Sequence, residues 1–239
     1  MEILISVVGA LIPSGLLLRY FYRSDRHPEP GGLLRGTFLW GIAIAAPAVI
    51  LALVLGVYED SVLDPLLFGL YSAFLGAAIP EELFKFLVVT RYSARHPEFN
   101  EAMDGVVYGA TASLGFATLE NLLYSFGDLG TALLRAFTAV PGHAFLGAIL
   151  GYYVGQSRFG LGRRPSVWFG LVVAVILHGL YDFPLLTIGK LANQAGEMSD
   201  SNALLILGLV VFVLAVLFIE ATWAVRLVRR LRREQEQRA

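Results

Sequence analysis

The chain of 239 residues contains no cysteine, and only 15% of its residues are Asp, Glu, Lys or Arg. Without cysteine it can form no disulfide, thiolate metal site or thiol nucleophile, and its redox compartment stays undetermined. Soluble domains have about 25% charged and about 45 to 50% apolar residues, whereas here 56% are hydrophobic and the mean hydropathy is +0.67. The composition therefore excludes a water-soluble domain, including a soluble catalytic module. It indicates an integral membrane protein.

Seven apolar stretches of about 20 residues or more are separated by short polar or Gly/Pro-rich connections. About 20 residues cross a bilayer as a helix, and a lipid-exposed backbone must satisfy its own hydrogen bonds, which favours helices. The alternating ten-residue pattern of a barrel is absent. We therefore predict an all-α, polytopic membrane protein that forms one domain over residues 1–239, with its first span retained because MEILIS lacks the basic start of a signal peptide. The seven predicted spans are 2–22, 33–56, 66–90, 105–127, 131–156, 165–187 and 203–225.

Arginine and lysine alternate between the connections. Fifteen of the 18 basic residues fall in the tail at 226–239, or within or at the edges of the first, third and fifth connections. Since basic loops stay in the cytoplasm, we expect the N-terminus outside and a basic cytoplasmic tail. No basic patch sits in a soluble domain, so we expect no nucleic-acid partner. The fifteen are Arg19, Arg23, Arg26, Arg35, Arg91, Arg95, Arg158, Arg163, Arg164, Arg226, Arg229, Arg230, Arg232, Arg233 and Arg238.

Besides Arg135 near a span end, seven Asp, Glu, Lys and His residues fall inside the third to sixth predicted spans. An ionisable group at the bilayer centre costs about 2.5 to 3.5 kcal/mol on insertion scales, so each needs a partner, a water cavity or a function. Span midpoints place most of them within roughly 10 Å of mid-membrane, where four spans can converge on one polar site. The seven are Glu81, Glu82, Lys85, Glu120, His143, His178 and Asp182.

Two spacings connect these residues locally. Lys85 follows Glu81 by four residues and Glu82 by three, so one ion pair is available within the helix and the excess acid must find another partner or hold a proton. His178 and Asp182 are four apart on one helical face, where a carboxylate can orient an imidazole or both can ligate one ion.

The residue types favour activation of water over covalent catalysis, because no Cys is present and no Ser is placed beside a base. Two histidines with carboxylates also suit a metal ion, and Glu81, Glu120, His143 and His178 are the candidate ligands. No HExxH motif occurs. The sequence leaves open whether the water is held by a metal or by carboxylates alone, and the cofactor is unknown, with zinc as the candidate.

Two other functions use the same cluster. Buried Glu, His and Lys residues also form the proton relays of transporters, although no inverted repeat relates the two halves of the chain. Alternatively, a scaffold would use the cluster only for interhelical hydrogen bonds, worth about 0.6 to 2 kcal/mol each.

Other features have simpler interpretations. Arg135 and Glu220 lie near span ends, where they can snorkel to headgroups. His27 and His96 are expected to be ordinary loop residues. Pro80 and Pro141 can break the helical hydrogen-bond ladder beside Glu81 and His143. The small-residue spacings Gly105/Gly109 and Gly147/Gly151/Gly155 predict close packing of the fourth and fifth spans.

Four motifs in order, PEELFKFLVV, EAMDGVVYGATASLGFATLENLLYS, PGHAFLGAILGYY and HGLYDF, resemble the PrsW family of intramembrane proteases. The resemblance covers residues 76–184, the motif core. It implies a multi-pass protein of a bacterial or archaeal cytoplasmic membrane. The implied activity is cleavage of a single-span membrane protein, such as an anti-sigma factor, on its extracytoplasmic side.

The family is distantly similar to the type II CAAX prenyl endopeptidases, and that likeness implies roles. Glu81 would activate water beside Glu82, Glu120 would replace a histidine, and His178 with Asp182 would stabilise the oxyanion. Asp182 stands where those enzymes have Asn, so it would need a proton, orient His178 or bind a metal.

We therefore expect an intramembrane endopeptidase in which Glu81 is the general base. The full set of predicted catalytic residues is Glu81, Glu82, Glu120, His143, His178 and Asp182, supported by Lys85, Phe116 and Asn121.

Overall fold

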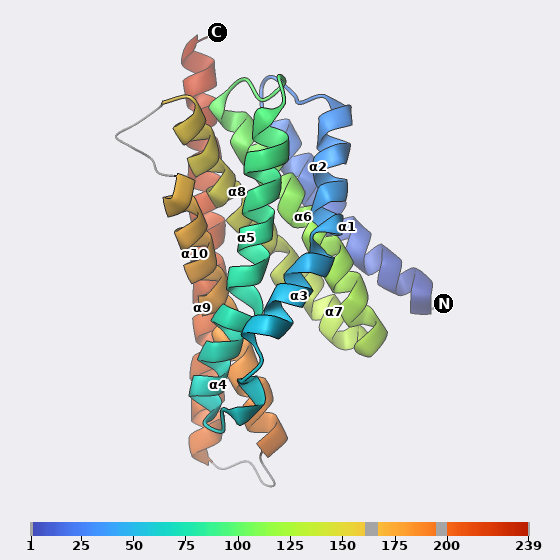
Figure 1. Cartoon of the computed structure of the whole chain (residues 1–239), viewed down its shortest axis with the longest axis vertical. Helices are drawn as coiled ribbons and strands as arrows, with labels where there is room; N and C mark the ends of the chain where they lie inside the picture. Colours follow the sequence, from blue (N-terminus) through green and yellow to red (C-terminus); the bar gives the residue numbers. More distant parts are fainter. Residues whose placement is uncertain (1, 161–166, 195–199, 239) are drawn as a thin grey trace.

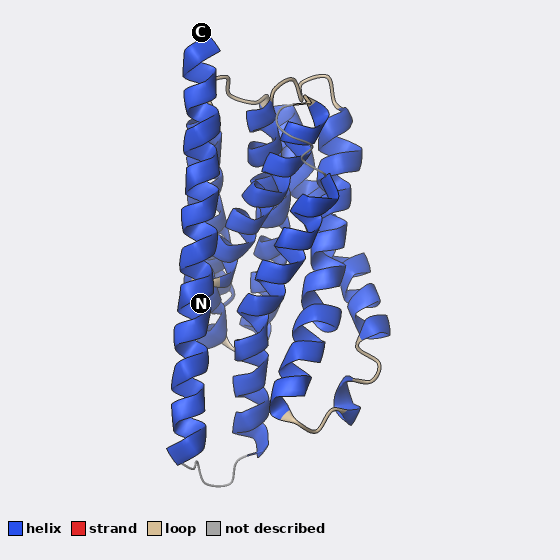
Figure 2. Ribbon diagram, turned by 90° about the vertical axis from the view of Figure 1, so that its left-hand side faces the viewer, coloured by secondary structure: helices blue, strands red, loops and turns tan. Residues whose placement is uncertain are grey.

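The computed structural model describes residues 2–160, 167–194 and 200–238, and in these ranges it contains helices and loops but no strand. The helices form a long bundle in which several run close to the same axis (Figures 1 and 2). The elements are α1 Glu2–Ser24, α2 Gly31–Ala43, α3 Ala45–Leu55, η1 Glu59–Ser61, α4 Pro65–Tyr71, η2 Ser72–Ala78, α5 Ile79–Leu87, η3 Val88–Tyr92, η4 Ser93–Arg95, α6 Ala102–Gly127, α7 Leu129–Phe137, α8 Ala139–Arg158, α9 Val167–Gln194 and α10 Asp200–Arg238.

The predicted all-helical class is confirmed, but the predicted number of seven spans is not. Four stretches within the described ranges are long and apolar enough to cross a membrane: Gly31–Ser61, Leu129–Arg158, Val167–Asn193 and Asn202–Gln237. The first of these contains α2 and α3, and the second contains α7 and α8. The chain is a multi-pass membrane protein, and apolar side chains of α3 and α10, such as Leu53, Val54, Leu204 and Phe218, are exposed on the outside of the bundle.

Helix α6 forms the centre of the bundle and packs most extensively against α8. Its residues 102–118 are all buried, and the two helices meet along the predicted glycines. A Cβ atom on Gly105 or Gly109 would collide with backbone atoms of Gly151 or Gly147. Only glycine permits such close approach of two backbones, so the predicted packing of these segments is confirmed.

The segment before the first acidic motif is not a regular α-helix. Residues Ser72–Ala78 form a π-helix, and Pro80 lies in the first turn of α5, directly before Glu81. Local π-helical turns often occur at functional sites, and a proline lacks the N–H that would continue the ladder. The helical ladder therefore changes where the two glutamates begin, in agreement with the predicted break at Pro80.

The C-terminal part of α10 lies at the same end of the bundle as the first and third connections (Figure 1). Arg26 forms an ion pair with Glu236 at 3.0 Å, and the Gln235 amide donates to Asp25 and to Glu101 at 2.7 Å. This grouping agrees with the alternation of basic residues. Arg163 and Arg164 of the fifth connection lie outside the described residues, and the orientation in the membrane remains a prediction from the sequence.

Candidate active site

Lys85 lies fully buried at the centre of the predicted site. Its Nζ is 2.8 Å from Glu82 Oε1 and 3.1 Å from Glu81 Oε2, both one turn earlier on α5. The same nitrogen is 2.9 Å from His143 Nδ1 on α8. One ammonium thus contacts both glutamates and joins α5 to α8, so the predicted local ion pair extends to two carboxylates and one imidazole.

His178 on α9 is held at both ring nitrogens. Its Nδ1 lies 2.9 Å from Glu82 Oε1, and its Nε2 lies 3.1 Å from Asp182 Oδ2 one turn later on the same helix. Glu81 Oε2 is 3.8 Å from Nε2. The excess carboxylate predicted for α5 is therefore resolved by Glu82 pairing with His178 across helices, while Asp182 fixes the orientation of the ring.

His143 is held in the same manner, which the sequence did not indicate. Its Nε2 lies 2.9 Å from Glu120 Oε2 on α6, so a carboxylate holds its outer nitrogen while Nδ1 faces Lys85. The same Glu120 oxygen lies 2.7 Å from an Arg135 guanidinium nitrogen on α7, and that guanidinium stacks on the Tyr124 ring. Four elements, α5, α6, α8 and α9, thus contribute to one network, the central cluster of Glu81, Glu82, Lys85, Glu120, His143, His178 and Asp182.

The two predicted supporting residues beyond Lys85 behave differently. The centre of the Phe116 ring lies 4.3 Å from Lys85 Nζ, which is a cation–π contact. The same ring meets the His143 ring edge to face at 5.8 Å. Asn121 is buried, but its Oδ1 has no hydrogen-bond partner and its side chain forms none of the contacts of the central cluster. Only Phe116 is therefore brought into the predicted site.

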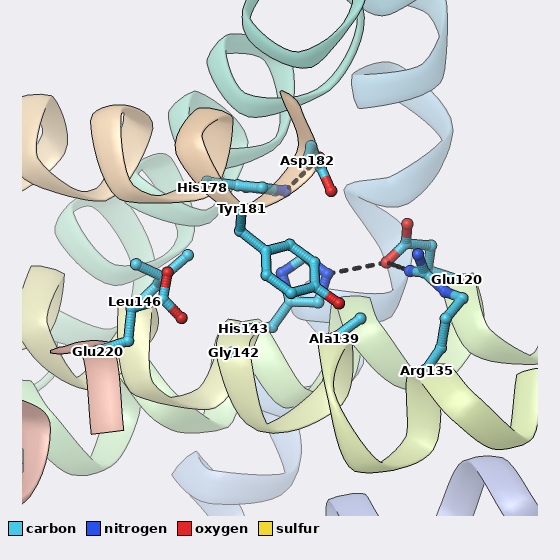
Figure 3. A pocket seen from close by; sticks show the side chains of 10 residues that line it. All are labelled: Glu120, Arg135, Ala139, Gly142, His143, Leu146, His178, Tyr181, Asp182 and Glu220. Atoms are coloured by element: carbon cyan, nitrogen blue, oxygen red, sulfur yellow. Dashed lines mark hydrogen bonds and ion pairs between the residues drawn. The ribbon is translucent and has the colours of Figure 1, made fainter. Parts of the chain in front are cut away.

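A small cavity of about 10 Å³ lies against both histidines, close to the volume that one water molecule needs. Figure 3 shows His143, His178 and Asp182 around it, together with Glu220 of α10. Glu220 is fully buried, and neither of its carboxylate oxygens has a hydrogen-bond partner. An acid from a fifth helix therefore lines the same space.

Two sequence interpretations are corrected by these contacts. Arg135 and Glu220 were expected to reach headgroups, but the Arg135 side chain is only 14% exposed and Glu220 is 0% exposed. Arg135 lies in the last turn of α7, and its guanidinium pairs with Glu120 of α6 instead of reaching outward. The signal available in the sequence was a single charge within an apolar stretch, which does not reveal the direction of the side chain.

A large cavity of about 680 Å³ reaches the central cluster from one side. Glu81, Glu120 and Asp182 line it, whereas Glu82 and Lys85 do not. Apolar residues form most of its walls, among them Val49 of α3 and Leu214 of α10. The central cluster therefore has an inner part that is closed off and an outer row of carboxylates facing an apolar space.

The donor set of the central cluster suits a metal ion. Glu81, Glu82, His143 and His178 each offer one ligand atom, and these atoms lie within 4.8 Å of one another. Each histidine presents Nδ1 to the interior while a carboxylate holds Nε2, which is the usual outer support of a metal-bound histidine. Glu82 Oε2 is buried without a partner. Since Lys85 Nζ contacts three of the same four side chains, a metal ion held by all four would require this ammonium to withdraw.

The known proteins that match this chain all indicate the same family. A family model described as "PrsW family intramembrane metalloprotease" matches residues 29–219. "Protease PrsW" of Geobacillus kaustophilus is 39% identical over 185 residues, covering 76% of this chain and 80% of the relative. "Protease PrsW" of Bacillus subtilis is 36% identical over 190 residues, covering 77% and 85%. No solved structure matches the chain significantly.

Proposed function

The chain belongs to the PrsW family of intramembrane metalloproteases, and on this basis we propose that the central cluster hydrolyses a peptide bond of a membrane-anchored protein. The observation that carries the proposal is the large cavity, because it brings an apolar space of peptide dimensions to a row of three carboxylates. Buried acids and histidines alone would also suit a polar packing network. A packing network needs no access from outside, so a cavity that leads to these acids favours a catalytic site over a packing network.

Glu81 is the residue that we assign as general base. Among the three carboxylates of the central cluster that line the large cavity, Glu120 is held by Arg135 and His143, and Asp182 is held by His178. Glu81 Oε2 accepts one hydrogen bond, from Lys85 at 3.1 Å, and lies at the longer distance of 3.8 Å from His178 Nε2. It is thus placed to take a proton from a water in the cavity and to return it to the leaving amine.

The other members of the central cluster position this chemistry. Glu82 is fully buried between Lys85 and His178, so its role is to anchor these two side chains. Glu120 and Asp182 orient His143 and His178 through their Nε2 atoms. His178, which lies closer to Glu81, is the group that we assign to stabilising the oxyanion by hydrogen bonding.

With the metal ion that the family description names, Glu81, Glu82, His143 and His178 would be the ligands, and zinc is the ion that this mixed nitrogen and oxygen set suits. These ligand roles would replace the roles of Glu81 as general base and of His178 as hydrogen-bond donor. When bound, such an ion lowers the pKa of water and polarises a carbonyl. Glu120 and Asp182 would then keep both imidazoles in the orientation that ligation needs.

The substrate that we propose is a single-span membrane protein, of which an anti-sigma factor is the type implied by the sequence resemblance. Helical backbone hydrogen bonds shield a peptide bond in lipid, so the substrate segment must be extended beside Glu81. The large cavity also includes Glu59 of η1 and Thr131 of α7. Helix α7 lies in the half of the bundle away from the C-terminal tail (Figure 1), so the predicted topology would give cleavage on the extracytoplasmic side.

The test is cleavage of a candidate single-span substrate in proteoliposomes by Glu81→Gln and His178→Ala proteins. Loss of a general base lowers turnover by about 10² to 10⁴ fold, and we expect the Glu81→Gln protein to show this loss. Glu98→Gln, an exposed acid in the third connection, is the matched control and should keep full activity. Undiminished turnover in both site variants would remove the assignment.

Metal dependence is measured in the same assay. Wild-type protein is treated with chelator, its zinc content is determined, and activity is measured before and after zinc is restored. Activity that falls and returns with zinc supports the four-residue site. Full activity in metal-free protein would leave a carboxylate mechanism based on Glu81 alone.

A further inference from the structure

A second group of buried carboxylates lies at the opposite end of α6 from Glu120. Asp25 follows α1, Glu29 precedes α2, and Asp104 lies in the first turn of α6. Their exposed fractions are 5%, 4% and 0%. One ligand oxygen from each residue lies within 4.8 Å of the others. We call these three residues the acidic triad.

Each member of the acidic triad is fixed by hydrogen bonds to one of its oxygens. Asp25 Oδ1 accepts from the Gln235 amide at 2.7 Å and from the His27 backbone at 2.9 Å. Asp104 Oδ2 accepts from the backbone nitrogens of Asn100 and Glu101 at 2.6 and 2.8 Å. Glu29 Oε2 accepts from the Tyr108 hydroxyl.

These bonds leave other oxygens of the same acids without an N–H or hydroxyl donor. Asp25 Oδ2 is buried and has no hydrogen-bond partner. Asp104 Oδ1 is buried without an N–H or hydroxyl donor, and the Asp104 side chain shares a hydrogen bond with the Glu29 carboxyl. A buried, unsatisfied polar atom costs about 1 to 3 kcal/mol, and more if it is charged. The triad is thus pre-organised, and it holds one acceptor atom, Asp25 Oδ2, that has no partner in the protein, beside two acids that can only share a proton.

Nearby basic groups do not neutralise the triad. His27 Nδ1 pairs with Glu101 at 2.9 Å, and Arg26 pairs with Glu236 at 3.0 Å. Among the described residues, no Lys, Arg or His side chain forms an ion pair with Asp25, Glu29 or Asp104. Burial raises the pKa of Glu29 to about 8 and that of Asp104 to about 6, and it also raises the pKa of Asp25. Negative charge is therefore costly here unless a cation accompanies it.

We propose that the acidic triad binds a hard divalent cation, Mg²⁺ or Ca²⁺, through Asp25, Glu29 and Asp104. All the available ligand atoms are oxygens, which these two ions prefer, whereas zinc sites commonly use nitrogen and sulfur. Asp104 precedes Glu120 by sixteen residues on one helix, so the two sites lie about 24 Å apart at about 1.5 Å per residue. The triad is therefore a separate site from the central cluster.

The bound ion would fasten three separate segments at this end of the bundle. Asp25 and Glu29 come from the first connection, Asp104 begins α6, and Gln235 of α10 donates both to Asp25 and to Glu101. An ion here would stabilise the docking of the α10 tail as well as the start of α6. The role of the site is structural, and it does not depend on the proposed proteolysis.

The experiment measures thermal unfolding of the purified full-length protein after chelator treatment, with Mg²⁺ or Ca²⁺ added singly. A cation at about 100 times its Kd should raise the wild-type Tm by roughly 5 to 10 °C. Glu29→Gln should lose this shift, because it removes one of the three carboxylates that would bind the cation. The variant should still fold, because the hydrogen bonds of Asp104 at the start of α6 are unchanged. Glu98→Gln is the control for a general effect of surface charge, and it should keep the shift.

A Glu81→Gln protein distinguishes this site from the proposed catalytic one. It should respond to Mg²⁺ or Ca²⁺ as the wild type does, since the triad is intact. Direct titration by calorimetry should give one binding event in wild type that is lost in Glu29→Gln. If neither ion binds the wild type, or if Glu29→Gln retains both the binding and the Tm shift, the proposal is wrong.

Discussion

The two ends of α6 carry groups of buried acids that are neutralised in opposite ways. The central cluster contains its own cation, Lys85, which contacts Glu81 and Glu82, and Arg135 pairs with Glu120. In the acidic triad, by contrast, no described basic side chain forms an ion pair with the three carboxylates. A buried carboxylate depends on an opposite charge placed beside it, whether from its own helix, as with Lys85, or from a neighbouring one, as with Arg135. The difference teaches that the same residue type can belong to a self-contained network or to a site that requires an ion from solution.

Lys85→Met tests this difference most severely, because it converts the central cluster into acids without an internal cation. Removing one partner of a buried ion pair typically costs about 3 to 5 kcal/mol, and we expect a loss of this size in the free energy of unfolding. Lys190→Met is the matched control, since that lysine is half-buried over the Phe68 ring. Denaturant unfolding in detergent measures both, and equal stability of the two variants would mean that Lys85 is not the essential counter-charge.

Arg135→Gln is expected to have the next largest effect, on activity. Arg135 holds Glu120, which in turn holds His143, so it is a positioning residue. Loss of such outer support typically costs about 10 to 100 fold. We expect kcat to fall by this factor with KM little changed, and Arg135→Lys to recover part of the loss. A raised KM with unchanged kcat would instead indicate that Arg135 contacts the substrate.

Glu220→Met is expected to have the smallest effect and the opposite sign. Glu220 is buried, and neither of its carboxylate oxygens has a hydrogen-bond partner. In lacking a counter-charge it resembles the acidic triad more than the adjacent central cluster. Replacing it with an apolar side chain of similar length removes a desolvation cost, and we expect about 1 kcal/mol of added stability, or roughly 2 to 4 °C in Tm. A clear decrease in Tm would show that Glu220 has a partner, such as a water in the small cavity.

The sequence was sufficient to predict the residues that meet in the central cluster. Ionisable groups are costly in lipid, so their positions in apolar stretches were informative without any structure. The pairs Lys85 with Glu81 and His178 with Asp182 followed from the helical repeat alone. Asn121 was selected only because it stands beside Glu120, and its side chain does not contact the cluster.

Contacts between helices could not be predicted from the sequence. The sequence gives no rotation of one helix against another, so the bonds from His143 to Lys85 and Glu120 were not predicted. The break between α7 and α8 at Thr138 agrees with the predicted effect of Pro141, which lies in the first turn of α8, but the sequence did not show that Arg135 faces Glu120. His27 is an exposed loop residue, as expected, but its pairing with Glu101 beside the acidic triad was not predicted.

By itself, the sequence determined that this chain is a helical membrane protein with acids and histidines buried in its apolar segments. The length of an apolar segment and the 3.6-residue period of a helix are local properties, so they can be recognised from the sequence alone. The tertiary structure alone decided that Glu81, Glu120 and Asp182 line the large cavity, whereas Glu82 is fully buried beside Lys85. It also decided that Asp25, Glu29 and Asp104 converge, because such neighbours depend on how the glycine-lined contact of α6 and α8 sets the positions of the surrounding helices.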